Sequence, residues 1–94
     1  MSAAREAQVK RLRMRSMRRG IKEMDLILMA YAEARLETMK AAELARYEAL
    51  LAENDQDLYQ WVSGQVAAPA EHAGMIADIR AVALSVTGGV GQTG

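Results

Sequence analysis

Helical periodicity is the feature that most restricts what this chain can fold into. Apolar residues recur three or four positions apart along almost its whole length, as in Met24, Leu28 and Tyr31, and this spacing places them on one face of an α-helix. No stretch shows the apolar–polar alternation, rich in Val, Ile and Thr, that is typical of a half-buried strand. The only proline is Pro69. The pattern therefore predicts an all-α fold without a sheet.

The periodic segments predict a compact bundle of about five short helices joined by connections of a few residues. The expected helices cover residues 4–18, 21–36, 39–52, 56–62 and 69–86.

Capping residues mark the expected helix ends. Gly20 is expected to end the first helix in the left-handed conformation, and Thr38 to cap the third. The pair Asn54-Asp55 should break the chain before the fourth helix, which Gly64 then ends. Pro69 is acceptable in the first turn of the fifth helix.

The 94 residues are enough for one small domain with a thin core. We assign residues 1–87 to this single helical domain and residues 88–94, GGVGQTG, to a flexible tail. The core is expected on the inner helix faces, with Leu58 and Trp61 holding the fourth helix. The remaining expected core residues are Val9, Leu12, Ser16, Ile21, Met24, Ile27, Leu28, Tyr31, Leu44, Tyr47, Leu50, Leu51, Tyr59, Val62, Met75, Ile76, Ile79, Val82 and Val86.

Residues that could carry chemistry are few. The chain has no cysteine, which excludes disulfides and Cys-ligated metals within it. His72 is the only histidine, and we expect it to be solvated and without a metal partner. The acidic run Glu53, Asp55 and Asp57 lacks the spacing of a calcium loop, so helix capping explains it better. We therefore predict no enzyme active site, no bound cofactor and no metal site.

Charge is divided unevenly along the chain. Residues 1–22 hold eight of the twelve basic residues and only one of the twelve acidic ones, although the net charge is zero. A nucleic-acid arm, a membrane arm, an organelle presequence, a docking surface and a solvated helix face are all compatible with such a segment. Aromatic residues for nucleic acid or a membrane are absent from it. Its arginines also run directly into Gly20, which leaves no segment to cleave off.

Two stretches of the chain resemble one known family. RRGIKEMD contains an R-G-x-x-E core at Arg19, Gly20 and Glu23, with Asp25 two residues later. YEALLAENDQDLYQWVSG resembles that family's segment between helices 3 and 4, in which a Leu-Leu run meets an acidic break followed by D-L-x-x-W. The family is SdhE, the succinate dehydrogenase assembly factors also called flavinators, and the resemblance covers about residues 8–85.

The resemblance implies a small helical bundle that binds the flavoprotein subunit of succinate dehydrogenase and, in some bacteria, that of fumarate reductase. Such proteins promote covalent attachment of FAD to a histidine of this client. The flavin chemistry then belongs to the client, and this chain is neither an enzyme nor a stable carrier of FAD. We expect no nucleic-acid partner, no membrane insertion and a monomer when free.

The same resemblance assigns the partner-binding role to the R-G-x-x-E segment: Arg18, Arg19, Gly20, Glu23 and Asp25. Gly20 would permit a sharp turn and a close approach of the partner backbone. Arg19 would offer its planar guanidinium to the client, while Glu23 either holds Arg19 or pairs with a client base. An ordinary surface pair between Arg19 and Glu23 is the structural alternative.

A generic helical adaptor that uses its basic arm on an acidic partner is the alternative function. For the location, no extension precedes the basic helix, which favours the bacterial cytoplasm over a mitochondrial precursor. A mature protein of the mitochondrial matrix is the other alternative.

Overall fold

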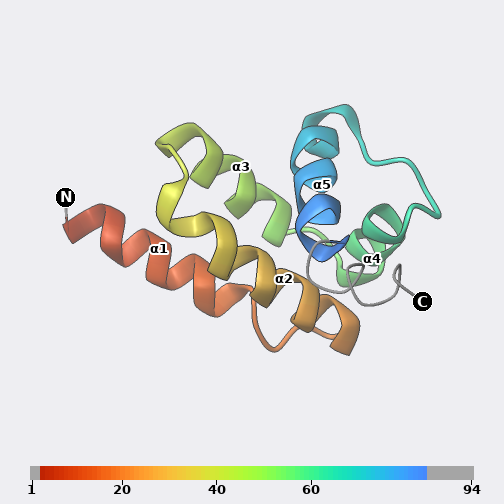
Figure 1. Cartoon of the computed structure of the whole chain (residues 1–94), viewed down its shortest axis with the longest axis horizontal. Coiled ribbons are helices and arrows are strands. Elements are labelled where there is room, and N and C mark those ends of the chain that lie inside the picture. Colours follow the sequence, from red (N-terminus) through yellow and green to blue (C-terminus); the bar gives the residue numbers. More distant parts are fainter. Residues whose placement is uncertain (1–2, 85–94) are drawn as a thin grey trace.

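The computed structural model describes residues 3–84, and its regular elements there are all helical (Figure 1). In chain order these are α1 (Ala3–Arg15), α2 (Lys22–Arg35), the short 3-10 helix η1 (Leu36–Thr38), α3 (Ala41–Leu51), α4 (Asp55–Ser63) and α5 (Ala70–Ala83). The predicted all-α bundle of five short helices is confirmed. The predicted tail and Val86 lie outside the described residues.

The central helix of the bundle is α2, which packs against α1, η1, α4 and α5. Figure 1 shows α1 running along α2, with α4 and α5 at the opposite end of the molecule from the N-terminus. The predicted inner faces are confirmed for most positions, and Leu12, Met24 and Tyr47 are fully buried. Trp61 is only half-buried against this core, and Leu36 and Met39 are core residues that periodicity did not indicate.

The end of α1 differs from the prediction. The helix stops at Arg15, three residues early, and the left-handed residue that follows it is Arg18 (φ 55°) instead of Gly20. The buried Ser16 lies at this stop. Its N–H still donates to the Leu12 carbonyl at 3.0 Å, its hydroxyl donates to the same carbonyl at 2.8 Å, and that hydroxyl lies 2.6 Å from the Tyr47 hydroxyl. A serine hydroxyl bonded to the preceding turn in this way slightly destabilises a helix.

The predicted cap of α3 is also wrong. Thr38 belongs to η1 and bonds the Arg35 carbonyl, so it is not available as a cap. The N-cap is Lys40, whose backbone N–H donates to the Glu43 carboxylate at 2.9 Å.

The predicted ends of α4 are confirmed. Asn54 is the N-cap, and its side chain accepts from the Gln56 N–H at 2.7 Å. Gly64 ends the helix in the left-handed conformation, with φ 85°. Pro69 lies one position before the first turn of α5, as its N-cap.

A polar link joins α2 to α5. The Tyr31 hydroxyl donates to the Asp78 carboxylate at 2.8 Å, and the Arg35 guanidinium reaches the same oxygen at 3.2 Å. Burial raises the pKa of Asp78, but the hydrogen bonds from Arg35 and Tyr31 outweigh burial and leave that pKa below its ordinary value. Burial and the bond to Asp78 raise the pKa of Tyr31. The helices are thus held by charge-assisted bonds as well as by apolar packing.

Candidate functional site

The predicted docking residues lie in the segment that joins α1 to α2 and in the first turn of α2. We call residues 18–25 the Arg-Gly corner. Its backbone begins with the left-handed Arg18 and passes into α2 after Ile21. The Asp25 carboxylate, in the first turn of α2, accepts the Arg19 N–H, so the helix holds the preceding loop by its backbone.

The Arg19 side chain is directed into the protein. Its Nε donates to Asp55 Oδ1 at 2.8 Å, and its terminal nitrogens donate to the Arg15 and Leu51 carbonyls, each at 2.9 Å. Only 12% of the side chain is exposed. Of the two roles left open for Glu23, the one in which it holds Arg19 is therefore excluded, because Asp55 at the start of α4 pairs with Arg19 instead.

The structure gives a second reason for glycine at position 20. The Gly20 N–H donates to Asp55 Oδ2 at 2.6 Å. A Cβ atom on residue 20 would lie 3.1 Å from that same oxygen, closer than ordinary van der Waals contact. Asp55 of this chain, which approaches from α4, would thus have to shift by a few tenths of an ångström to accommodate a side chain at position 20.

The five predicted docking residues divide into two groups. Arg19 and Asp25 are half-buried and hold the corner together. Arg18, Gly20 and Glu23 are exposed, and neither Arg18 nor Glu23 has an ion-pair partner within residues 3–84. The corner therefore presents a cation, a bare stretch of backbone and a carboxylate on a supported loop.

Asp55 is the residue that the sequence reasoning missed. The sequence indicates only a helix-capping role for it, although its two oxygens accept from both Arg19 and Gly20. The only sequence feature that could have indicated this role is that Asp55 lies in the second stretch that resembles the family. That resemblance does not indicate that the two stretches are in contact.

A hollow of about 320 Å³ lies beside the corner, between α2, α4 and α5. Glu23 lines it from the corner, and Tyr59 and Arg80 line it from α4 and α5. The exposed carboxylate of the corner thus lies at the mouth of a partly apolar depression.

The basic first helix is held against the rest of the chain by ion pairs. Arg11 and Arg15 both reach Glu48 on α3, at 3.2 and 3.5 Å, and Arg13 reaches Glu37 on η1 at 3.4 Å. These arginines are therefore partly occupied within the protein. The basic segment is a packed helix of the bundle and not an extended arm.

His72 is buried, so the expectation that it is solvated is wrong. Its side chain is 4% exposed, and Nε2 lies 2.8 Å from a Glu53 oxygen and 3.6 Å from a Glu71 oxygen. The ring also packs near Trp61, with centroids 5.6 Å apart. These three side chains are the kind of group that can hold a metal ion. The hydrogen bond between His72 and Glu53 accounts for their arrangement without one.

No helix in the described part of the chain is both long enough and apolar enough to cross a membrane.

Comparison with known proteins assigns this chain to a family. The family described as flavinator of succinate dehydrogenase matches residues 10–83. The protein named "Succinate dehydrogenase assembly factor 2, mitochondrial" from Schizosaccharomyces pombe is 38% identical over 65 residues, which are 69% of this chain and 47% of that protein. Its namesake from Mycosarcoma maydis is 36% identical over 72 residues, 77% of this chain and 30% of that protein.

A third relative of the same name, from Candida glabrata, is 47% identical over 53 residues, 56% of this chain and 35% of that protein. The chain thus spans less than half the length of each of these three relatives. All three are fungal proteins named as mitochondrial, which contradicts the expected bacterial cytoplasmic location.

The matched region includes the Arg-Gly corner, Asp55 and every helix from α2 to α5. Because the match covers most of the chain, the chain belongs to the family of succinate dehydrogenase assembly factors known as flavinators.

Proposed function

We propose that this chain docks through the Arg-Gly corner onto the flavoprotein subunit of succinate dehydrogenase and promotes covalent attachment of FAD to that subunit. The observation that carries the proposal is the exposed trio Arg18, Gly20 and Glu23, which lie on the loop that Asp55 holds and in the first turn of α2 that follows it. Family membership supports the assembly role, and the corner supplies a surface suited to it.

The proposed action is a shift in the client's conformation. A preorganised corner loses little conformational freedom on binding, so more of its binding energy can favour one client state. The favoured state is the one in which the flavin site is complete. In this proposal FAD and the client supply the bond-forming chemistry, and the chain is a chaperone-like factor and not an enzyme.

The generic adaptor is less well supported as an alternative. It requires a basic arm that is available to an acidic partner, whereas Arg11, Arg13 and Arg15 already contact Glu48 or Glu37.

In-gel flavin fluorescence tests the proposal. The succinate dehydrogenase flavoprotein is expressed with and without this chain, denatured, and examined under ultraviolet light for covalently bound flavin. The wild-type chain should brighten the band, whereas Gly20→Glu and Arg18→Ala should not. Arg46→Ala is the matched control, since Arg46 is an exposed residue of α3 without an ion-pair partner among residues 3–84.

Equal bands in every lane, with no co-purification of the two proteins, would contradict the proposal. A Gly20→Glu chain that has lost its far-UV circular dichroism would assign Gly20 a structural role instead. Repeating the experiment with the fumarate reductase flavoprotein tests whether the chain also serves that client.

A further inference from the structure

His72 is a buried polar residue with no part in the Arg-Gly corner as described so far. Apart from the two core tyrosines, Ser16 and His72 are the only buried polar residues within residues 3–84. His72 lies in the first turn of α5, where its backbone N–H donates to the Pro69 carbonyl at 2.9 Å. Burial of a polar ring is unfavourable unless the ring is hydrogen-bonded. An apolar side chain would avoid this cost, so packing alone does not account for a histidine here.

The His72 side chain is bonded to the α3–α4 connection, residues 52–54. Its Nε2 lies 2.8 Å from an oxygen of Glu53, which belongs to this connection. A carboxylate can only accept, so Nε2 carries the proton and donates it to the bond. The Trp61 ring on α4 packs near the imidazole, with centroids 5.6 Å apart. The imidazole is therefore in contact with α4 and with the connection that precedes it.

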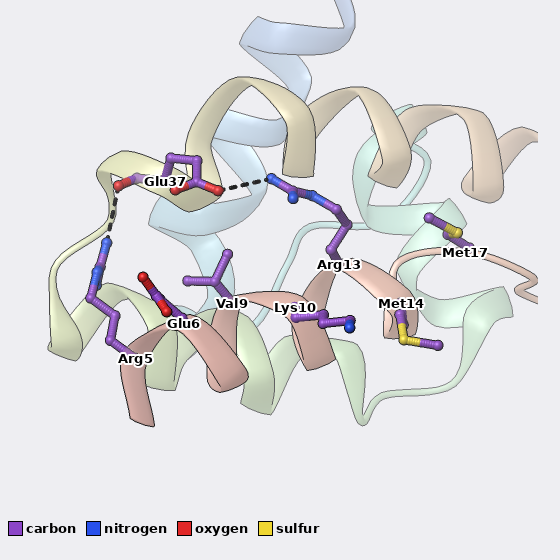
Figure 2. Close-up of a pocket in the computed structure, with 8 residues that line it drawn as sticks. All are labelled: Arg5, Glu6, Val9, Lys10, Arg13, Met14, Met17 and Glu37. Carbon is purple, nitrogen blue, oxygen red and sulfur yellow. Dashed lines mark hydrogen bonds and ion pairs between the residues drawn. The ribbon is translucent and has the colours of Figure 1, made fainter. Parts of the chain in front are cut away.

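This bond differs from the ion pairs that hold α1. Figure 2 shows Arg13 reaching across an open hollow to Glu37, whose side chain is 68% exposed. Exposed pairs of this kind contribute little to stability. The His72 side chain is only 4% exposed, so water has little access to its N–H. The bond to Glu53 is therefore costly to break, because breaking it leaves a buried donor without an acceptor.

The α3–α4 connection also holds the Arg19 side chain. The Arg19 guanidinium donates to the carbonyls of Leu51 at 2.9 Å and of Glu53 at 3.5 Å. It also donates from Nε to Asp55 Oδ1 at 2.8 Å. These acceptors lie within residues 51–55, at the end of α3, in the connection and at the start of α4. Glu53 thus accepts from α5 with its side chain and from the corner with its backbone.

We infer that His72 is a positioning residue for the Arg-Gly corner. From α5 it fixes Glu53, and Glu53 lies two positions before Asp55 in the same short segment. The orientation of the Asp55 carboxylate toward Arg19 and Gly20 therefore depends on the bond between His72 and Glu53. The effect on docking rests on the proposed function, whereas the effect on the shape of the corner does not.

Three variants separate this bond from the packing around it. His72→Leu keeps an apolar side chain but removes the donor, whereas His72→Gln offers an amide N–H in place of Nε2. Glu53→Ala removes the acceptor from the more exposed side of the bond, so the test does not depend on the folding of His72→Leu. Ile79→Val is the stability control, because Ile79 is a fully buried residue of the same helix. Thermal unfolding of each variant sets the temperature at which all are folded.

Hydrogen exchange of the Gly20 amide, followed by NMR on the free chain, is the first measurement. This N–H donates to Asp55 Oδ2, so its protection reports the position of that carboxylate. We expect at least about fivefold faster exchange in His72→Leu and Glu53→Ala, the factor that corresponds to one lost hydrogen bond. His72→Gln and Ile79→Val should exchange like the wild type.

Calorimetric titration with the purified succinate dehydrogenase flavoprotein subunit is the second measurement. His72→Leu and Glu53→Ala should raise Kd by about fivefold or more, because binding then has to restore the shape of the corner. His72→Gln and Ile79→Val should bind with the Kd of the wild type. A purely structural role of His72 would instead give His72→Leu and Ile79→Val the same Kd once both are folded.

The two measurements separate failure of this inference from failure of the proposed function. Gly20 exchange that is the same in His72→Leu and the wild type, or equally fast in Ile79→Val, would overturn the positioning role whatever the client does. An altered exchange rate with an unchanged Kd would also overturn it. If exchange responds as expected but the wild-type chain does not bind the subunit, the proposed function fails and the support of the corner by His72 stands.

Discussion

Asp55 accepts from two donors of the Arg-Gly corner at once, the Arg19 guanidinium and the Gly20 N–H. Both bonds have an ionised acceptor, and the Arg19 side chain is largely shielded from water. Charge-assisted bonds in such surroundings are stronger than those between exposed ions. At the scale of single residues, Asp55 therefore sets the shape of the corner from a position outside it.

Replacing Asp55 with asparagine should destabilise both the fold and the corner. An amide offers one oxygen and an NH₂ group, so one of the two donors would face another donor. We expect a loss of roughly 1–3 kcal/mol in the free energy of unfolding, measured by urea denaturation. Asp57→Asn makes the same change in the same helical turn at an exposed position and should cost less than about 0.5 kcal/mol. Equal losses for the two variants would contradict this role.

Arg18 adopts a left-handed backbone conformation. This conformation is unfavourable in free energy for any L-residue that carries a side chain. The variant Arg18→Gly should therefore raise the free energy of unfolding by roughly 0.5–1 kcal/mol, while it removes an exposed cation from the corner and weakens client binding. Thermal unfolding and calorimetric titration measure the two effects. Arg46→Gly, within α3, should instead lose about 1 kcal/mol without affecting binding. Lower stability of Arg18→Gly would show that the strain is not relieved.

The sequence located the corner but not its support. Arg18, Gly20 and Glu23 are exposed where the motif indicated, since local pattern identifies a loop and its residues. Asp55 lies 36 positions from Arg19, and a contact at that separation depends on how α4 packs, which no local pattern states. The same reason explains the error at His72, which is bonded to Glu53 in the α3–α4 connection and packs near Trp61 on α4.

Individual helices show which local signals were sufficient. Asn54 and Gly64 were identified correctly as the ends of α4, because an Asn cap and a left-handed glycine act within their own turn. The caps predicted at Thr38 and Gly20 are wrong. Thr38 belongs to η1 and bonds the Arg35 carbonyl, and the backbone N–H of Gly20 is bonded to the distant Asp55. Helix type was therefore predictable throughout, but helix ends only where no distant group intervened.

Replacing two of the helix glycines with alanine should change the stability in opposite directions. Gly64 has φ 85°, and a Cβ there would lie 3.2 Å from the Arg80 guanidinium, so Gly64→Ala should lose about 1 kcal/mol of stability. Gly74 lies inside α5 with open space around it, so Gly74→Ala should gain roughly 0.5–1 kcal/mol. Chemical denaturation measures both. A shift of the same sign in the two variants would contradict the assignment of α5 or of the α4 cap.

In the whole molecule, basic residues of the N-terminal segment form ion pairs with acidic residues of the later elements. α1 pairs with acids on α3 and η1, and Arg19 pairs with α4, so the uneven charge of the sequence becomes a set of bonds between elements. The exposed pairs each contribute little. Most of the stability comes instead from the shared core, in which Tyr31 and Tyr47 are nearly inaccessible and their ring centroids lie 5.4 Å apart.

Alkaline pH should destabilise the fold through these tyrosines. Burial raises the pKa of Tyr47 to about 12, although Ser16 and Arg19 oppose the shift, whereas the unfolded value is about 10. The folded state therefore holds this proton more tightly. Its contribution is fully present below about pH 10 and is lost as pH rises toward about 12.

Urea denaturation of the wild type and of Tyr47→Phe measures this effect. The stability difference between the two proteins should shrink by roughly 2 kcal/mol from about pH 9 to about pH 12. A constant difference over this range would show that the Tyr47 proton does not contribute.

The ion pair between Arg19 and Asp55 also has a consequence for synthesis on the ribosome. The corner residues leave the exit tunnel first, but the carboxylate that shapes them follows 36 positions later, at the start of α4. A nascent chain therefore carries the R-G-x-x-E motif as sequence well before it presents the folded corner. Under the proposed function, only a chain whose α4 has been made and packed can recognise the client, so unfinished or fragmented chains do not compete for it.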